Sequence, residues 1–137
     1  MAGAYIDTSA LGRVLLGEPD AAAIVEALRG FDRHVSSRLL ALELRRLALR
    51  HDAADDAELI LAAVALVAIE EPLLDRADRI EPESVAALDA IHLACAVALA
   101  AAGAIEVMVT FDRQLAEGCA AHGLAVLEPG RSPGTRG

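Results

Sequence analysis

Four carboxylates stand where they could act together. Asp7 follows the apolar run "AYI" and Asp112 follows "VMVTF", so each comes at the carboxyl end of an expected strand, while Glu43 and Asp89 lie on apolar helical patterns. Open α/β sheets place their ligands outside the carboxyl ends of the strands. Carboxylates that meet there raise one another's pKa or require a cation, and hard oxygen ligands select Mg²⁺ or Mn²⁺. Such ions serve the attack of water on a phosphodiester.

Three of these acids also have an ordinary structural explanation. Asp7 and Asp112 are each placed to cap the N-terminus of the helix that follows a strand. Asp89 opens a helix, where the helix dipole favours a negative charge. Taken singly, each acid is therefore explained without any ligand, and only the set points to a cation site.

Glu43 is harder to explain by local structure alone. Leu39, Leu40 and Leu47 lie three or four residues away, which puts the carboxylate on an apolar stripe. An unpaired buried carboxylate costs several kcal/mol. We therefore expect Glu43 to have a cation, a strong set of hydrogen bonds or an extended path to solvent.

His92 and Asp89 are the only polar side chains of the run "LDAIHLACAVALAAAG". The rest is apolar, so this helix is expected to be buried all round. No second histidine or cysteine stands at metal-ligand spacing from His92. We expect His92 to form a local hydrogen bond rather than to bind a metal.

Hydrophobic periodicity and the Gly and Pro breakers predict strands that alternate with helices. Strands are expected at 4–6, 34–36, within "VAIEEP", in "EVMVTF" and in "LAVLEP". Helices are expected at 9–16, 20–29, 39–50, 55–67, within "PLLDRADRIEPES", at 88–102 and in "DRQLAEGCAAHG". The stripe predicted for 55–67 consists of Leu59, Ala62, Ala63 and Leu66.

This alternation predicts an α/β fold, with a mostly parallel central sheet flanked by helices on both faces. A chain of 137 residues suits a single domain. We expect that domain to span residues 1–129. The last residues, 130–137, have no apolar anchor and are expected to form a disordered tail.

Charge and composition narrow the function classes. The net charge is −9, so the molecule as a whole should repel nucleic acid, and any nucleic-acid contact must be local. The chain contains no lysine, and all its basic residues are arginine. This argues against phosphoryl transfer through an aspartyl phosphate, as in receiver domains and haloacid-dehalogenase-like phosphatases, which rely on a lysine.

Two isolated cysteines, Cys95 and Cys119, lie in helical patterns without metal or redox spacing. We expect them to be reduced, which suits a cytoplasmic protein. No signal peptide is expected at the N-terminus, and the longest apolar stretch, 93–105, is too short for a bilayer span of about 20 residues. No membrane role is expected.

Four segments, in order along the chain, resemble the PIN-domain family, and in particular the VapC ribonuclease toxins of bacterial toxin–antitoxin pairs. They are "YIDTSAL", "LLALELRRLALR", "LDAIHLACA" and "VTFDRQL", the last followed by "HGLAVLEP". Together they cover nearly the whole chain, from about Ala4 to Pro129.

The resemblance implies that Asp7, Glu43, Asp89 and Asp112 form a catalytic site for Mg²⁺, with Mn²⁺ as a substitute. It suggests that Thr8 or Ser9, together with Thr110, forms hydrogen bonds near these acids, which hydroxyl groups permit. Arg113 is a candidate for a contact to a substrate phosphate, or for an ion pair with a surface acid.

For function, the resemblance implies an endoribonuclease that leaves 5′-phosphate and 3′-hydroxyl ends. It also implies a homodimer that a cognate antitoxin silences by covering the active-site groove. Further phosphate contacts are expected from Arg13, Arg38, Arg45, Arg46 and Arg50. The alternative is a PIN-like module that holds RNA or a protein partner without catalysis.

Overall fold

The computed structural model of the protein describes residues 2–130. Five strands and seven helices alternate through this part of the chain. The strands are β1 (Gly3–Ile6), β2 (Arg33–Ser37), β3 (Ala65–Val67), β4 (Val107–Val109) and β5 (Ala125–Leu127). The helices are α1 (Thr8–Leu15), α2 (Ala21–Leu28), α3 (Arg38–Arg50), α4 (Ala54–Leu61), α5 (Glu71–Ala77), α6 (Ala87–Ala101) and α7 (Arg113–Ala121).

The strands form one sheet in the order β3-β2-β1-β4-β5, and every neighbouring pair is parallel. The central strand β1 pairs Tyr5 with Val35 of β2 on one side and with Met108 of β4 on the other. Because all strands run the same way, their carboxyl ends lie at one edge of the sheet. The α/β class and the parallel sheet expected from the sequence are confirmed.

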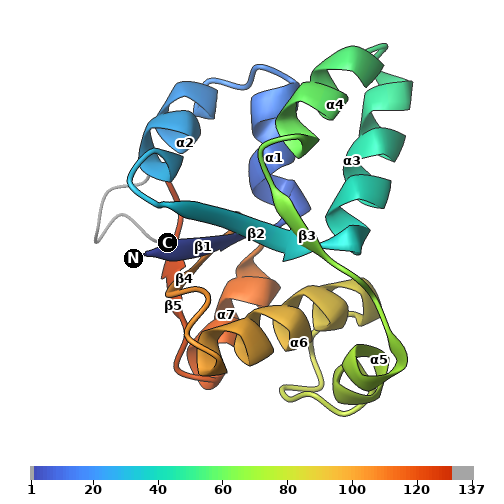
Figure 1. Cartoon of the computed structure of the whole chain (residues 1–137), viewed down its shortest axis with the longest axis vertical. Coiled ribbons are helices and arrows are strands. Elements are labelled where there is room, and N and C mark those ends of the chain that lie inside the picture. The colour runs from blue at the N-terminus through green and yellow to red at the C-terminus, as the bar shows by residue number, and fades with distance from the viewer. Residues whose placement is uncertain (1, 131–137) are drawn as a thin grey trace.

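Two layers of helices cover the sheet. Helices α1 to α4 lie on one side and α5 to α7 on the other (Figure 1). Side chains of β1 alternate between the two cores: Ala4 and Ile6 pack in the first, and Tyr5 packs in the second with α6 and α7. Strand side chains point to opposite faces in turn, so this alternation is the direct consequence of a β1 buried on both sides.

The sequence prediction is wrong at α4, where a helix over 55–67 was expected. The helix ends at Leu61, and Ala65–Val67 form β3 at the edge of the sheet. Its buried residues are Ala57 and Leu61, whereas Leu59 of the predicted stripe is 73% exposed. The run "LAAVALVA" contains no Gly or Pro breaker, and a short apolar run does not distinguish a helix end from a strand.

The predicted tail, residues 130–137, lies outside the described residues except for Gly130. Within residues 2–130, no helix is long and apolar enough to cross a membrane. Helix α6, the longest within residues 2–130, is buried through Ala90 and the residues from His92 to Ala96, but Ala87 and Leu88 in its first turn are exposed and its last residues are at most partly covered. The expectation that it is buried all round therefore holds only for the middle of the helix.

Candidate functional site

The four predicted carboxylates line a single pocket of about 190 Å³ at the carboxyl edge of the sheet. Asp7 directly follows β1, and Asp112 follows β4 after two residues. Glu43 comes from the middle of α3, and Asp89 from the first turn of α6. The complete lining is Asp7, Thr8, Ser9, Glu43, Asp89, His92 and Asp112. Four acids from four separate elements thus meet in one place.

Asp7 is the innermost of these carboxylates and is 3% exposed. Its Oδ1 accepts hydrogen bonds from Ser9 Oγ at 2.8 Å and from the Ala10 amide at 3.3 Å, and its Oδ2 accepts from Thr110 Oγ1 at 2.7 Å. The helix-cap interpretation is correct, because the Ala10 contact caps α1. Burial raises the Asp7 pKa, although these hydrogen bonds oppose the shift.

Hydroxyl groups tie the ends of β1 and β4 together. Ser9 Oγ lies 3.2 Å from Thr110 Oγ1 and accepts a 2.7 Å hydrogen bond from the Phe111 amide. Thr110 Oγ1 in turn accepts from the Asp112 amide at 3.0 Å. Asp112 Oδ1 caps α7 by accepting from the Leu115 amide at 2.9 Å. Asp7 and Asp112 therefore cap their helices and line the pocket at the same time.

Glu43 resolves the conflict between its charge and its apolar helix through hydrogen bonds. Its Oε1 accepts from Thr8 Oγ1 at 2.6 Å and lies 3.0 Å from His92 Nε2. Burial works to raise the Glu43 pKa, but the hydrogen bonds from His92 and Thr8 outweigh it, and the pKa lies below its ordinary value. Glu43 is therefore ionised at neutral pH.

Asp89 has no hydrogen-bond partner among residues 2–130. Burial, followed by the nearby charge of Asp112, raises its pKa to about 6, and the charges of Asp7 and Glu43 add to the shift. His92 opposes it. The group most affected by its like-charged neighbours is thus the one that no donor stabilises.

The sequence prediction for His92 is wrong about its partners. The ring forms no local hydrogen bond; it connects Tyr5 of β1 with Glu43 of α3, at separations of 87 and 49 residues. A signal for this was present in the sequence. Tyr5 alternates away from Ala4 and Ile6, so its hydroxyl enters the core that contains α6, and a buried hydroxyl needs a partner.

The donor set of the pocket fits a hard divalent cation, because its four carboxylates supply only oxygen ligands and accumulate uncompensated negative charge. Within residues 2–130, no three acidic, histidine or cysteine side chains already hold the geometry of a metal centre. The hydrogen bonds explain part of this, since both Asp7 oxygens and Glu43 Oε1 are engaged within the protein.

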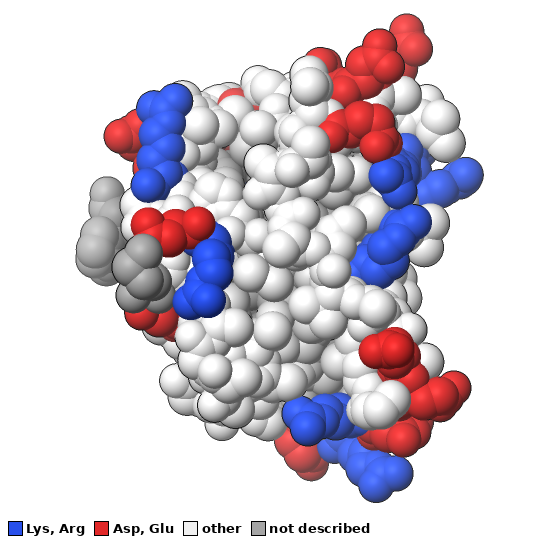
Figure 2. Space-filling view, in the orientation of Figure 1, with Lys and Arg blue, Asp and Glu red and all other residues white. Residues whose placement is uncertain are grey.

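A groove of about 550 Å³ runs from the acidic pocket along α3 and shares Thr8 and Glu43 with it. Arg46 and Arg50 line this groove, together with Leu42 and Leu88, which are 56% and 54% exposed. Positive side chains gather over α3 (Figure 2).

Other predicted phosphate contacts are occupied elsewhere. Arg13 pairs with Asp20 at 3.0 Å, and its guanidinium lies 4.3 Å from the centre of the Phe111 ring. Arg45 donates two hydrogen bonds to Glu58, at 2.8 and 3.0 Å. Arg113 does not line the acidic pocket; it is exposed, 3.7 Å from Glu117.

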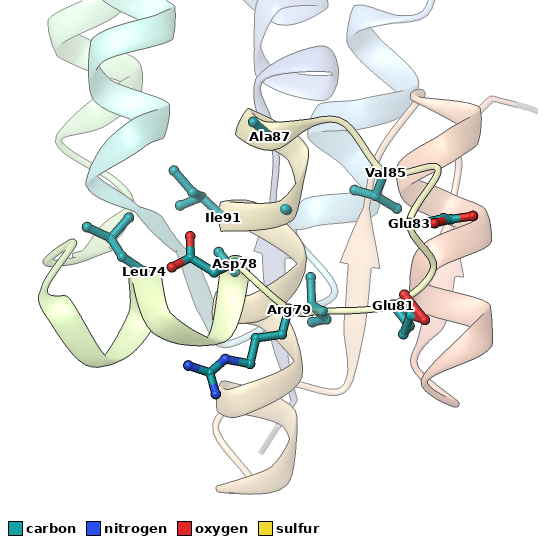
Figure 3. A pocket seen from close by; sticks show the side chains of 11 residues that line it. Leu74, Asp78, Arg79, Glu81, Glu83, Val85, Ala87 and Ile91 are labelled. Carbon is teal, nitrogen blue, oxygen red and sulfur yellow. The ribbon is translucent and has the colours of Figure 1, made fainter.

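Another pocket, of about 530 Å³ and therefore larger than the acidic pocket, lies between α5 and the start of α6 (Figure 3). None of the four carboxylates lines it. Leu74 of α5 and Ile91 of α6 line it, and the loop that connects the two helices forms its rim. Its acids Asp78, Glu81 and Glu83 are all exposed. The pocket therefore offers apolar surface but no converging set of chemical groups.

The two cysteines are free and buried. Burial raises the pKa of Cys95 to about 11 and that of Cys119 to about 12, so both remain thiols at neutral pH. Neither lines the acidic pocket. The pocket's chemistry thus belongs to its carboxylates.

Comparison with known proteins identifies the family and the fold of this chain. The family model described as "PIN domain" matches residues 4–120. A Mycobacterium tuberculosis protein named ribonuclease VapC47 is 31% identical over 134 residues, which cover 92% of this chain and 96% of the relative. Ribonuclease VapC46 of the same species is 31% identical over 131 residues, covering 94% and 99%.

Solved structures share the fold at lower sequence identity. A toxin–antitoxin complex from Klebsiella pneumoniae contains a chain with a TM-score of 0.71 and 20% identity, covering 94% of this chain and 99% of that one. The crystal structure of M. tuberculosis VapC20, titled a sarcin–ricin-loop-cleaving toxin, gives a TM-score of 0.67 at 20% identity and covers 92% and 99%.

Proposed function

This chain belongs to the PIN domain family, and on that premise we propose that it is a Mg²⁺-dependent endoribonuclease toxin that hydrolyses RNA phosphodiester bonds at the acidic pocket. Mn²⁺ is expected to substitute for Mg²⁺. The relatives that cover nearly the whole chain are named ribonucleases, which supports the substrate class.

One observation carries the proposal: carboxylates from the end of β1, α3, α6 and the loop after β4 share one small pocket, where burial, followed by the charges of the other acids, raises the pKa of Asp89 to about 6. Isolated helix caps would not need to converge. Without a cation this arrangement is unfavourable, and a divalent ion relieves it. The ion would be held by Asp7, Glu43, Asp89 and Asp112.

A bound divalent cation supplies the Lewis acidity that lets water attack a phosphodiester at neutral pH. The protein's own groups fix the geometry for that attack. Ser9 and Thr110 hold the Asp7 carboxylate from both oxygens, and Thr8 holds Glu43. Asp89 and Asp112 complete the negative surface of the pocket. Preorganised ligands of this kind place the scissile phosphate without the cost of reordering side chains during the reaction.

The RNA strand next to the scissile phosphate is proposed to follow the groove along α3. Arg46 and Arg50 have no ion-pair partner among residues 2–130, and they line a groove that is continuous with the acidic pocket. They offer the local positive charge that a protein of net charge −9 needs to hold a polyanion. Arg13 and Arg45 already have carboxylate partners and are weaker candidates.

We also propose that a cognate antitoxin covers the acidic pocket and that the protein acts in the cytoplasm as a homodimer. The support for an antitoxin is family membership and the toxin–antitoxin complex among the proteins of similar fold.

The chemistry of the products tests the proposal. Total bacterial RNA is incubated with the protein and Mg²⁺, the fragment ends are mapped, and a short RNA that contains the mapped site is then made with a 2′-deoxy substitution at the scissile nucleotide. We expect 5′-phosphate and 3′-hydroxyl ends, and cleavage that survives the substitution, because water is the nucleophile. Cyclic phosphate ends, or a block by the 2′-deoxy group, would contradict the proposal.

A further inference from the structure

We infer that His92 is a positioning residue that fixes one oxygen of Glu43 and so leaves the other free for the divalent cation. The inference rests on the proposed function, because it assigns a cation to the pocket that Glu43 lines. It adds a residue with no direct contact to substrate or ion.

His92 lies on α6 and is 2% exposed. Its Nδ1 is 2.7 Å from the Tyr5 hydroxyl, and its Nε2 is 3.0 Å from Glu43 Oε1. The rings of Tyr5 and His92 meet edge to face, with centroids 5.7 Å apart and an interplanar angle of 79°. Three elements distant in sequence, β1, α6 and α3, are thus connected through one buried imidazole.

The protons of this chain of hydrogen bonds have a defined direction. Burial raises the pKa of Tyr5, so its hydroxyl keeps its proton. The Glu43 carboxylate only accepts, so the hydrogen between it and His92 lies on Nε2. In the neutral ring Nδ1 is then an acceptor, and the Tyr5 hydroxyl, whose oxygen also accepts a 3.2 Å hydrogen bond from the Ser37 amide, donates its proton to it. Tyr5 in this way selects the tautomer that Glu43 requires.

The two Glu43 oxygens consequently differ. Oε1 accepts from both Thr8 and His92, whereas Oε2 has no hydrogen bond within residues 2–130. A glutamate side chain has several freely rotating bonds, and anchoring one oxygen removes most of this freedom before a ligand arrives. Glu43 is thereby presented to the pocket as a ready ligand.

His92→Gln and His92→Met form a matched pair for the test. The two side chains are similar in length, but only glutamine carries an N–H near the position of Nε2. Mn²⁺ affinity is measured by electron paramagnetic resonance of free Mn²⁺, and the metal-free melting temperature reports the fold of each variant. Partners outside the ligand shell typically change metal affinity by about 10- to 100-fold. We expect His92→Met to weaken Mn²⁺ binding at least about tenfold relative to the unmodified protein. His92→Gln should keep most of the affinity that His92→Met loses.

Tyr5→Phe gives a second measurement, which decides the matter if His92→Met does not fold. It keeps the buried ring and removes only the hydroxyl that selects the tautomer. We expect a smaller loss of Mn²⁺ affinity, about threefold, with Thr8 still holding Glu43. An unchanged affinity in folded Tyr5→Phe and folded His92→Met would overturn the inference.

Other outcomes separate this inference from the proposed function. Equal losses in His92→Gln and His92→Met would show that the shape of the ring matters and its N–H does not, which also overturns it. If the unmodified protein binds no Mn²⁺, the proposed metal site fails, and the inference fails with it. If the unmodified protein binds Mn²⁺ and the variants bind it equally well, only the role of His92 is lost.

Discussion

Asp7 and Asp89 face the same pocket but are treated in opposite ways by the fold. Asp7 is 3% exposed and accepts hydrogen bonds from Ser9, Ala10 and Thr110. Asp89 is half-buried and has no hydrogen bond among residues 2–130, and its like-charged neighbours help burial to raise its pKa to about 6. One carboxylate is held by donors of the protein itself, and the other has no donor among residues 2–130 to stabilise its charge.

The two sides of the acidic pocket would contribute differently to the proposed cation site. On the strand side of the pocket, the hydroxyls of Ser9 and Thr110 donate hydrogen bonds that hold the Asp7 carboxylate in place. These donors are neutral, so they do not cancel its charge. On the helix side the charge remains uncompensated at Asp89. A fully satisfied cluster would have little to gain from a cation, and a fully unsatisfied one would be costly to fold.

The largest expected effect is on cleavage, where the two acids should behave alike. Asp7→Asn and Asp89→Asn each remove a proposed ligand, so each should lower RNA cleavage in Mg²⁺ by more than about 100-fold. Their metal-free stabilities should differ, because Asp89→Asn removes repulsion whereas Asp7→Asn turns an amide N–H toward Thr110 or Ser9. Asp89→Asn should melt above, and Asp7→Asn below, the unmodified protein at pH 7.5. Equal Tm shifts in both variants would contradict the different environments assigned to Asp7 and Asp89.

Divalent cations should produce the next largest effect. An ion that binds only the folded state stabilises it by about 2.7 kcal/mol at one hundred times its Kd, or roughly 5 to 10 °C in a domain of this size. We expect Mn²⁺ or Mg²⁺ to raise the Tm by this amount. An excess of chelator should reverse the rise. Asp89→Asn should abolish most of it. A full rise in that variant would place the ion elsewhere.

The stability of the metal-free protein should depend on pH through Asp89 and Asp7. Because the Asp89 pKa is raised to about 6 in the folded state, the folded protein holds this proton more tightly than the unfolded chain. Its contribution to stability is full below the ordinary aspartate pKa and is lost as the pH rises through 6; Asp7 acts in the same direction.

Glu43, with its lowered pKa, acts oppositely, and its contribution is lost only as the pH falls below its ordinary value. From pH 4.5 to 7 the Tm should therefore fall, by about 3 °C for the part due to Asp89 after allowance for solvent screening. Thermal melts of the unmodified protein and Asp89→Asn in chelator measure this part. A Tm that rises over this range, or an identical slope in both proteins, would contradict the assigned environment of Asp89.

The smallest expected effect concerns the groove that leads to the pocket. Arg46→Gln removes an arginine that lines the groove, and Arg45→Gln removes its neighbour in sequence, which is paired with Glu58. Both variants change the net charge equally. Arg46→Gln should weaken RNA binding about threefold and lower its salt dependence, with little change for Arg45→Gln. Similar losses in both would mean that only net charge matters.

Much of the site was predictable from sequence because its parts are local. Asp7 and Asp112 follow short apolar strands, and parallel strands bring their carboxyl ends to one edge. The hydrogen bonds of Ser9 to Asp7 and of the Asp112 amide to Thr110 join residues two apart and follow from local geometry, whereas the bond from Thr110 to Asp7 spans 103 residues and depends on the pairing of β1 with β4.

The chain from Tyr5 through His92 to Glu43 was not predicted, because its members meet only in the tertiary fold and periodicity assigns residues to faces without pairing them. The end of α4 was missed for a different reason. An apolar run without breakers suits both helix and strand, and the pairing of β3 with β2 decides it. Long-range pairing thus accounts for both failures.

Metal-dependent cleavage of RNA distinguishes the proposed nuclease from a module that only binds RNA or protein. Total bacterial RNA is incubated with the purified protein in Mg²⁺, in excess chelator, and in chelator followed by added Mg²⁺, with Asp89→Asn purified in parallel. We expect discrete fragments with Mg²⁺, none in chelator, recovery on addition of the ion, and none from Asp89→Asn under any condition. Cleavage that persists in chelator, or that is equal in the two proteins, would contradict the proposed nuclease.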